Sequence, residues 1–307
     1  MYLASYSGLQ VRLNNGPWLN WSESVTPSDP DITALAVHGQ TIWVGAREGV
    51  YRSLNAGHTF TAVNIAPGRL FVSEIQIDDQ RVALVTRTQG LMLSSDGGGT
   101  WVSRGASDGL VGFPMSVHAV GNRVIVGTSD GHAAISTDGG ATFRTFNANN
   151  GALSDSAYAV LATPSRFYVG TGTGLHVSDD DGNSWTTRST APGLPNNGVR
   201  CLFQTPDNVL VVCGLSALGV SFDAGESFSV RRNGLPCFGG WINKVLVRGD
   251  VWWVGTSTLL YRSLDAGANF EPISGTGRSE ITGLAVMGDR LIVSGTWGVL
   301  AALSPMQ

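Results

Sequence analysis

Residues 94–101 read SSDGGGTW, and their pattern recurs along the whole chain. The fixed positions are Ser94, Asp96, Gly98, Thr100 (threonine or serine in the copies) and Trp101 (tryptophan or phenylalanine). Complete copies also occupy residues 136–143, 178–185 and 221–228; copies at 53–60 and 263–270 carry one substitution each, and a degenerate copy begins at residue 12. The first positions are separated by 41, 41, 42, 42, 43 and 42 residues. This regular spacing indicates one supersecondary unit that is repeated along the chain.

Strand-like segments surround each octet. In one repeat they lie at residues 32–37, 41–44, 50–53 and 60–63, as short apolar or alternating runs bounded by turn residues. Such runs predict β-strands. Four strands in a period of about 40 residues are typical of one blade of a β-propeller, so an all-β fold is predicted.

The octet itself predicts a tight hairpin between the third and fourth strands of each blade. Its carboxylate can accept hydrogen bonds from N–H groups in the turn, and its glycine can adopt a positive φ that a Cβ disfavours. The closing aromatic ring is expected to pack between neighbouring sheets. The carboxylates with this structural role are Asp96, Asp138, Asp180, Asp223 and Asp265.

The octet resembles the Asp-box, or BNR repeat, of sialidases, two-propeller xyloglucanases, sortilin-type receptors and photosystem II assembly factors. The resemblance covers nearly the whole chain and implies that the box is a scaffold hairpin away from the ligand face. A sialidase needs an arginine triad, a Tyr–Glu nucleophile pair and six blades, none of which can be assembled from this sequence, and the Arg-Ile-Pro signature of that family is absent. A xyloglucanase needs a second propeller and two facing carboxylates. A single ring fits the assembly factors best, although these typically carry an arginine patch and an export signal, and no export signal is visible.

Seven innermost strands are expected, beginning near residues 32, 72, 115, 157, 199, 242 and 281. They predict a single domain over residues 1–307, a seven-bladed β-propeller of four-stranded blades. The last repeat ends before an octet, so a strand near residues 18–23 is expected to complete that blade and close the ring. Strands at 2–6 and 9–13 raise the strand total above that of seven blades without reaching eight. Seven blades are expected, with the surplus hairpin beside the closing blade.

The composition limits the class of protein and its partners. The chain has 307 residues, with 41 glycines, 42% hydrophobic and 14% charged residues, and a net charge of −4. These values argue against a coiled coil and a disordered chain. With Lys244 as the single lysine, they also argue against nucleic-acid binding. No segment predicts a membrane helix or a signal peptide, so a soluble protein is expected, cytoplasmic unless a signal peptide has been removed.

The cysteines and histidines predict neither a metal nor a cofactor. The cysteines Cys201, Cys213 and Cys237 fall at one end of the fifth repeat, where a disulfide, a thiol pair or free buried thiols are all compatible with the sequence. The five histidines are scattered without metal-ligand spacing. The acidic run at residues 179–181 belongs to an octet, which fits a solvated turn better than a calcium site.

Three charged residues interrupt the innermost strands. The expected ligand face consists of the loops that lead into the innermost strands and the loops between second and third strands; we call it the funnel face. Aligned at one height on the seven strands are Ala34, Glu74, Ser116, Ala159, Cys201, Lys244 and Gly283. Glu74 and Lys244, with Arg200 at the preceding position, break a small or apolar pattern, which can mark function. They are predicted to hold an anionic or hydroxylated ligand, with Glu74 as acceptor or general base; alternatively, they pair only with one another or with water.

Further ligand-binding candidates are expected on the same rim. They are Asn243, Tyr158, Trp241, Trp297, Arg47 and Asp130. Exposed tryptophans can stack on sugar rings, whereas the alternative is that they fill gaps between blades.

The function predicted is that of a binding or scaffolding propeller, with a small-molecule, glycan or protein ligand at the funnel face. The alternative is a carbohydrate-active enzyme, a glycoside hydrolase or lyase, with its site in the same funnel. Glu74 with Asp108 or Asp130 is then the acidic grouping to test.

Overall fold

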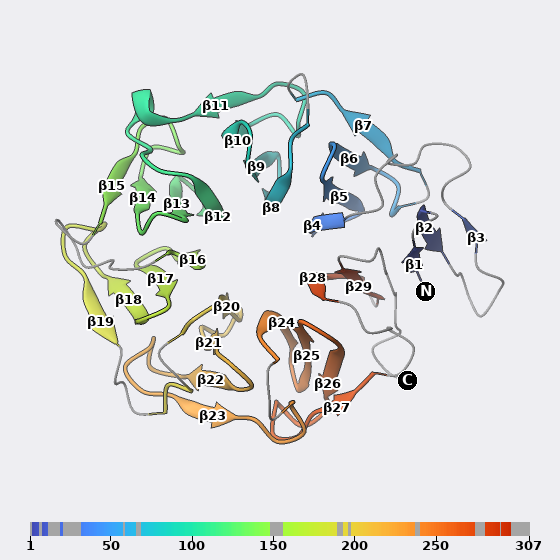
Figure 1. Cartoon of the computed structure of the whole chain (residues 1–307), viewed down its shortest axis with the longest axis vertical. Helices are drawn as coiled ribbons and strands as arrows, with labels where there is room; N and C mark the ends of the chain where they lie inside the picture. Colours follow the sequence, from blue (N-terminus) through green and yellow to red (C-terminus); the bar gives the residue numbers. More distant parts are fainter. Residues whose placement is uncertain are drawn as a thin grey trace.

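The computed structural model describes residues 2–5, 8–11, 19–20, 32–57, 59–65, 69–147, 156–188, 193–195, 198–236, 240–273, 280–288 and 290–295. Within these ranges the chain is all-β apart from one short 3-10 helix, η2 (Ala106–Asp108). Small antiparallel sheets stand around a central opening (Figure 1). The β-propeller predicted from the repeat is confirmed.

Six sheets have four strands each, joined in chain order from the innermost strand to the outermost (Figure 1). Their strands are β4 (Ile32–His38), β5 (Thr41–Ala46), β6 (Val50–Ser53) and β7 (Thr61–Val63); β8 (Val72–Asp78), β9 (Arg81–Thr86), β10 (Gly90–Ser94) and β11 (Val102–Arg104); β12 (Pro114–Val120), β13 (Arg123–Thr128), β14 (Ala133–Ser136) and β15 (Arg144–Phe146); β16 (Ala159–Ala162), β17 (Phe167–Thr171), β18 (Gly174–Ser178) and β19 (Thr186–Arg188); β20 (Cys201–Gln204), β21 (Leu210–Cys213), β22 (Leu218–Ser221) and β23 (Ser229–Arg231); β24 (Ile242–Arg248), β25 (Val251–Thr256), β26 (Leu260–Ser263) and β27 (Glu271–Pro272).

The prediction of seven four-stranded blades is wrong, because the described residues form six. Blade number therefore does not argue against a sialidase. Between the sixth blade and the first lies a sheet of two strands, β28 (Ile281–Met287) and β29 (Arg290–Gly295). Ile292 of β29 packs with Ile32 of the first blade, and Val293 packs with Trp253 of the sixth, so this sheet fills the gap in the ring. All seven expected innermost strands form, but within the described residues only six of them belong to four-stranded sheets.

The expected closure of the ring by an N-terminal outer strand is also wrong for the described residues. β1 (Tyr2–Ser5) pairs with β2 (Gly8–Val11), and β3 (Leu19–Asn20) pairs with β2, which gives a separate three-stranded sheet. Figure 1 shows this sheet outside the ring. The surplus hairpin predicted at residues 2–6 and 9–13 therefore forms, as β1 and β2. β3 pairs with β2 of this hairpin and does not pair with the closing blade.

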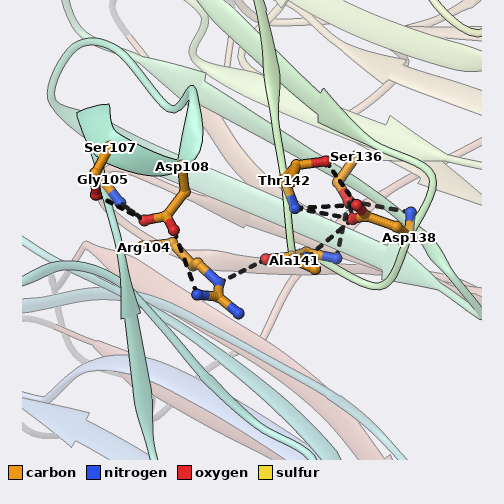
Figure 2. A network of polar contacts seen from close by, with 9 residues as sticks. Arg104, Gly105, Ser107, Asp108, Ser136, Asp138, Ala141 and Thr142 are labelled. Carbon is orange, nitrogen blue, oxygen red and sulfur yellow. Dashed lines mark hydrogen bonds and ion pairs between the residues drawn. The ribbon is translucent and has the colours of Figure 1, made fainter.

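The octets from residue 53 onward, as far as the structure describes them, form the predicted turn between a third and a fourth strand. In the turn after β14, the Ser136 hydroxyl donates to Asp138 Oδ1 (2.6 Å), and Asp138 Oδ1 accepts the N–H groups of Ala141 and Thr142 (2.9 and 3.0 Å; Figure 2). The N–H of Gly140 donates to Ser136 Oγ (2.8 Å). Corresponding Ser–Asp and Gly–Ser bonds occur in the octets that contain Asp96, Asp180, Asp223 and Asp265.

The hydrophobic core is divided among the interfaces between sheets. The described residues contain seven clusters, and each is shared by two neighbouring sheets. Trp43 of the first blade, 1% exposed, packs with Val72 and Leu84 of the second, and Trp252 packs with Cys213 of the fifth blade in the same way. This packing holds the innermost strands side by side around the opening.

Candidate functional site

Backbone hydrogen bonds between neighbouring blades define the funnel face. The N–H of Phe71, just before β8, donates to the carbonyl of Arg47 in the β5–β6 turn (2.9 Å), and the N–H of Ala157, before β16, donates to the carbonyl of Thr128 at the end of β13 (3.0 Å). The two predicted sets of loops therefore share one face. The octets lie on the other face, where the N–H of Gly97 donates to the carbonyl of Gln80 in the β8–β9 turn (2.7 Å).

Glu74 and Lys244 meet across the central opening. A β-bulge precedes each residue, and the strands β8 and β24 that carry them lie on opposite sides of the opening (Figure 1). Lys244 Nζ lies 3.3 Å from Glu74 Oε1, and the two side chains are 39% and 25% exposed. Two of the three predicted charges thus pair with each other.

The second oxygen of Glu74 joins two neighbouring blades. Its Oε2 accepts the N–H of Val117 in β12 (2.9 Å), and Oε1 of Gln76, two residues further along β8, accepts the N–H of Ala119 (3.2 Å). With Lys244 on Oε1 and Val117 on Oε2, both Glu74 oxygens are engaged. This arrangement favours the structural alternative for Glu74 over a free general base.

His118 makes a similar contact between the third and fourth blades. Its Nδ1 accepts the N–H of Ala162 (3.2 Å). Burial lowers the pKa of His118 to about 4, against a weaker opposing effect of Asp78, so the imidazole is neutral near pH 7 and can accept this bond. His118 therefore has a structural role between these two blades.

Arg200 has a different environment from Glu74 and Lys244. Its guanidinium lies 4.1 Å from the ring centroid of Tyr158 and 4.2 Å from that of Trp241, between one aromatic side chain of the fourth blade and one of the sixth. All three residues are half-buried, directly before the innermost strands β16, β20 and β24. The described residues provide no carboxylate that forms an ion pair with Arg200. We call these three residues the arginine stack.

The other predicted rim residues have local partners or lie elsewhere. Asn243 donates from Nδ2 to Glu280 Oε1 (3.2 Å), and Asp130 Oδ2 lies 3.1 Å from His132 Nδ1. Despite partial burial, which acts in the opposite direction, hydrogen bonds led by that from Thr128 lower the pKa of Asp130. Arg47 is exposed in the β5–β6 turn. Trp297 lies outside the described residues.

A pocket of about 870 Å³ opens on the half of the funnel face formed by the first three blades. Arg47 of the first blade, Phe71 and Arg87 of the second, and Phe113 and Met115 of the third line it. The sequence had singled out only Arg47 among these. The sequence feature that could have predicted this pocket is the loop between the second and third blades. This loop contains large apolar residues, which a loop exposed only to solvent does not require.

The carboxylates proposed for an enzyme have structural partners. Asp108 accepts the N–H of Gly105 (3.0 Å) and lies 3.4 Å from Arg104 Nη1 (Figure 2). Asp130 contacts His132, and Glu74 contacts Lys244 and Val117. Each of the three carboxylates thus forms hydrogen bonds or ion pairs within the protein.

Cys201 and Cys213 form a disulfide between directly opposed positions of β20 and β21, with their Cα atoms 4.9 Å apart. This realises one of the arrangements left open by the sequence, whereas Cys237 lies outside the described residues. The described residues bring together no metal-binding group of three or more His, Cys, Asp or Glu side chains. No helix in the described part of the chain has the length and hydrophobicity of a membrane span.

Comparisons with known proteins give matches in structure alone: neither a protein-family model nor a curated protein matches the sequence. A structure of YCF48 bound to D1 peptide aligns with a TM-score of 0.69 and 15% identity over 95% of this chain and 98% of that one. The fold is a β-propeller. YCF48 from Cyanidioschyzon merolae aligns with a TM-score of 0.67 and 17% identity (92% and 98% covered). The WD40 propeller domain of Doa1 aligns with a TM-score of 0.69 and 12% identity (98% and 96% covered). At these identities the likeness concerns the fold and assigns no activity.

Proposed function

We propose that this protein is a binding or scaffolding β-propeller that recognises a protein partner at the funnel face, with the arginine stack as a central contact. In this proposal, residues 1–307 form one propeller domain and the octets are Asp-boxes that support the blades. Lys244, Glu74, Asn243, Arg47 and Asp130 are secondary candidates on the funnel face, and Trp297, outside the described residues, stays a candidate from the sequence alone.

The observation that carries the proposal is the position of Arg200 between two aromatic rings. Stacking orders the guanidinium while its N–H donors remain at the edge of its plane, the geometry used to bind a carboxylate with two hydrogen bonds. The described residues supply no carboxylate for Arg200, so its N–H donors are available to a carboxylate of a ligand. Aromatic and arginine side chains are also the types that dominate protein–protein binding energy. The likeness to YCF48 bound to D1 peptide supports a peptide or protein as that ligand.

The proposal can be tested by selecting peptides from a random display library on the full chain and measuring their affinities by calorimetry. Arg200→Ala is expected to weaken the selected peptides by about tenfold or more, since a stacked hot-spot arginine is removed. Arg200→Lys keeps the charge but loses the planar stack, so it should also weaken binding. Arg232→Ala is the matched control, because it removes an exposed arginine from the segment after β23. A selection in which Arg200→Ala weakens none of the selected peptides would overturn the arginine stack as a central contact, and a selection that yields no binders would overturn the proposal.

A further inference from the structure

The pocket between the first three blades has an apolar wall that is open to solvent. Phe113 is 72% exposed and Met115 38% exposed, and Val111 in the same segment is 47% exposed. Three large apolar side chains within five residues form a local apolar surface of the kind that marks interaction sites on soluble proteins. Phenylalanine and methionine are also enriched in the cores of protein interfaces.

Another part of the pocket lining is cationic. Arg47 and Arg87 form this part, and no acidic residue is among the described residues that line the pocket. Arg87 is exposed and makes no hydrogen bond or ion pair with its side chain among the described residues. The chain as a whole has a net charge of −4, so this local excess of positive charge differs from the rest of the molecule. A cationic wall of this kind is complementary to carboxylates.

Phe71 fixes the spacing of the two arginines. Its N–H donates to the carbonyl of Arg47 (2.9 Å), and its carbonyl accepts the N–H of Arg87 (3.1 Å). Its φ of 48° lies in the left-handed region, which is uncommon for an aromatic residue and persists where the surroundings determine the backbone. One strained residue therefore holds the β5–β6 and β9–β10 turns together at the pocket.

We infer that this pocket binds an extended acidic peptide segment of a partner protein. A bulky apolar side chain of the segment lies against Phe113 and Met115, and a neighbouring carboxylate contacts Arg87 and Arg47. The inference rests on the proposed binding function and adds a second contact site, formed by blades that do not contribute to the arginine stack. The apolar and cationic parts of the lining together select a segment that carries a bulky apolar side chain next to a carboxylate.

The test is a fluorescence anisotropy titration with a labelled peptide of alternating acidic and apolar residues, Gly-Asp-Phe-Asp-Leu-Glu-Gly. Its neutral counterpart has Asn and Gln in place of Asp and Glu. Arg87→Glu is expected to weaken the acidic peptide at least about tenfold, and Phe113→Ser at least about fivefold. The controls are Arg232→Glu, which makes the same charge change elsewhere, and Phe222→Ser, which removes an equally exposed phenylalanine (73%) from the octet face. Both controls should bind within about twofold of wild type.

The outcomes separate this inference from the proposed function. Loss of binding in Arg87→Glu and Phe113→Ser, with Arg200→Ala unchanged, supports the pocket as a site of its own. Loss in Arg200→Ala alone overturns the pocket and leaves the proposed function intact. Equal binding of the acidic and neutral peptides, equal losses in the controls, or no binding of the acidic peptide at millimolar protein also overturns the inference.

Discussion

At Glu74 the two carboxylate oxygens have different partners, an ammonium across the central opening and a backbone N–H of the next blade. The first partner is a partly exposed charge, and such ion pairs contribute little stability. The second is a backbone donor, which loses a partner if the acceptor is deleted. The contribution of Glu74 to the fold is therefore expected to come mainly from the bond to Val117.

We predict that Glu74→Ala destabilises the protein by about 1–2 kcal/mol, whereas Glu74→Gln changes its stability by less than about 1 kcal/mol. Glutamine keeps an oxygen that can accept the N–H of Val117, and alanine does not. The measurement is urea unfolding at neutral pH. Lys244→Met serves as the control, because it removes the ion pair and leaves the Val117 bond in place. Equal losses in Glu74→Ala and Glu74→Gln would show that the charge, and not the acceptor, carries the effect.

The three charged residues of the innermost strands were predictable from the sequence, whereas their contacts were not. Glu74, Arg200 and Lys244 could be found because each interrupts a repeated pattern. Their pairing could not, because Glu74 and Lys244 are 170 residues apart and meet only when β8 and β24 face each other across the opening. Tyr158 and Trp241 could be predicted as rim residues, but their shared contact with Arg200 depends on the relative position of three blades.

The octet hairpin was predictable in detail because its interactions are local. Serine, aspartate and glycine lie within five residues, so their spacing alone determines which atoms can bond. The turn also contributes to packing between blades: Gly98 has a φ of 87°, and an added Cβ would overlap Trp43 Cη2 of the preceding blade and lie 2.9 Å from Cζ2. Trp43 is almost fully buried and has little room to move.

We predict that Gly98→Ala destabilises the protein by about 2–4 kcal/mol, because it adds a steric clash to the strain of a positive φ. Gly39→Ala is the matched control: Gly39 has a φ of 58°, and no atom lies within 4 Å of its added Cβ. The control should cost only about 1 kcal/mol. Thermal and urea unfolding of the two variants give the comparison. A Gly98→Ala protein no less stable than Gly39→Ala would mean that Trp43 moves without cost.

The ring as a whole is the scale at which the sequence was least informative. The repeat length correctly predicted a propeller and the position of every innermost strand. It did not predict that, within the described residues, β28 pairs with β29 alone and β3 pairs with β2, since strand pairing depends on contacts between segments that are far apart in the sequence. The apolar surfaces of Ile292 and Val293 nevertheless complete the interfaces with the first and sixth blades.

Stability of the whole molecule is predicted to fall as the pH is lowered from about 6.5 to 4. His176 is 1% exposed, both its ring nitrogens contact threonine hydroxyls (3.1 and 3.0 Å), and burial lowers its pKa to about 4. Between an ordinary pKa of 6.5 and 4, the unfolded chain binds a proton that the folded chain does not, which favours unfolding. For His176 the loss is on the order of 3 kcal/mol. Below pH 4 the octet carboxylates add to it, because hydrogen bonds lower the pKa of Asp138 and its counterparts.

The measurement is the urea midpoint between about pH 8 and pH 4.5. His176→Gln should have a shallower dependence on pH than wild type, whatever its stability at pH 8, because the variant lacks the buried imidazole. His38→Gln replaces an exposed histidine and should follow the wild-type curve. Identical pH dependences of the urea midpoint for wild type and His176→Gln would contradict the role given to the buried His176 imidazole.

The pair that bridges the central opening has a practical consequence for chemistry on this protein. Lys244 carries the only side-chain amine in the sequence, and it stands among the innermost strands, partly open to solvent. An amine-selective reagent therefore has one side-chain target, and this target lies at the mouth of the opening. A dye or photoreactive group attached there would report on whatever approaches the funnel face without any engineered cysteine or added tag.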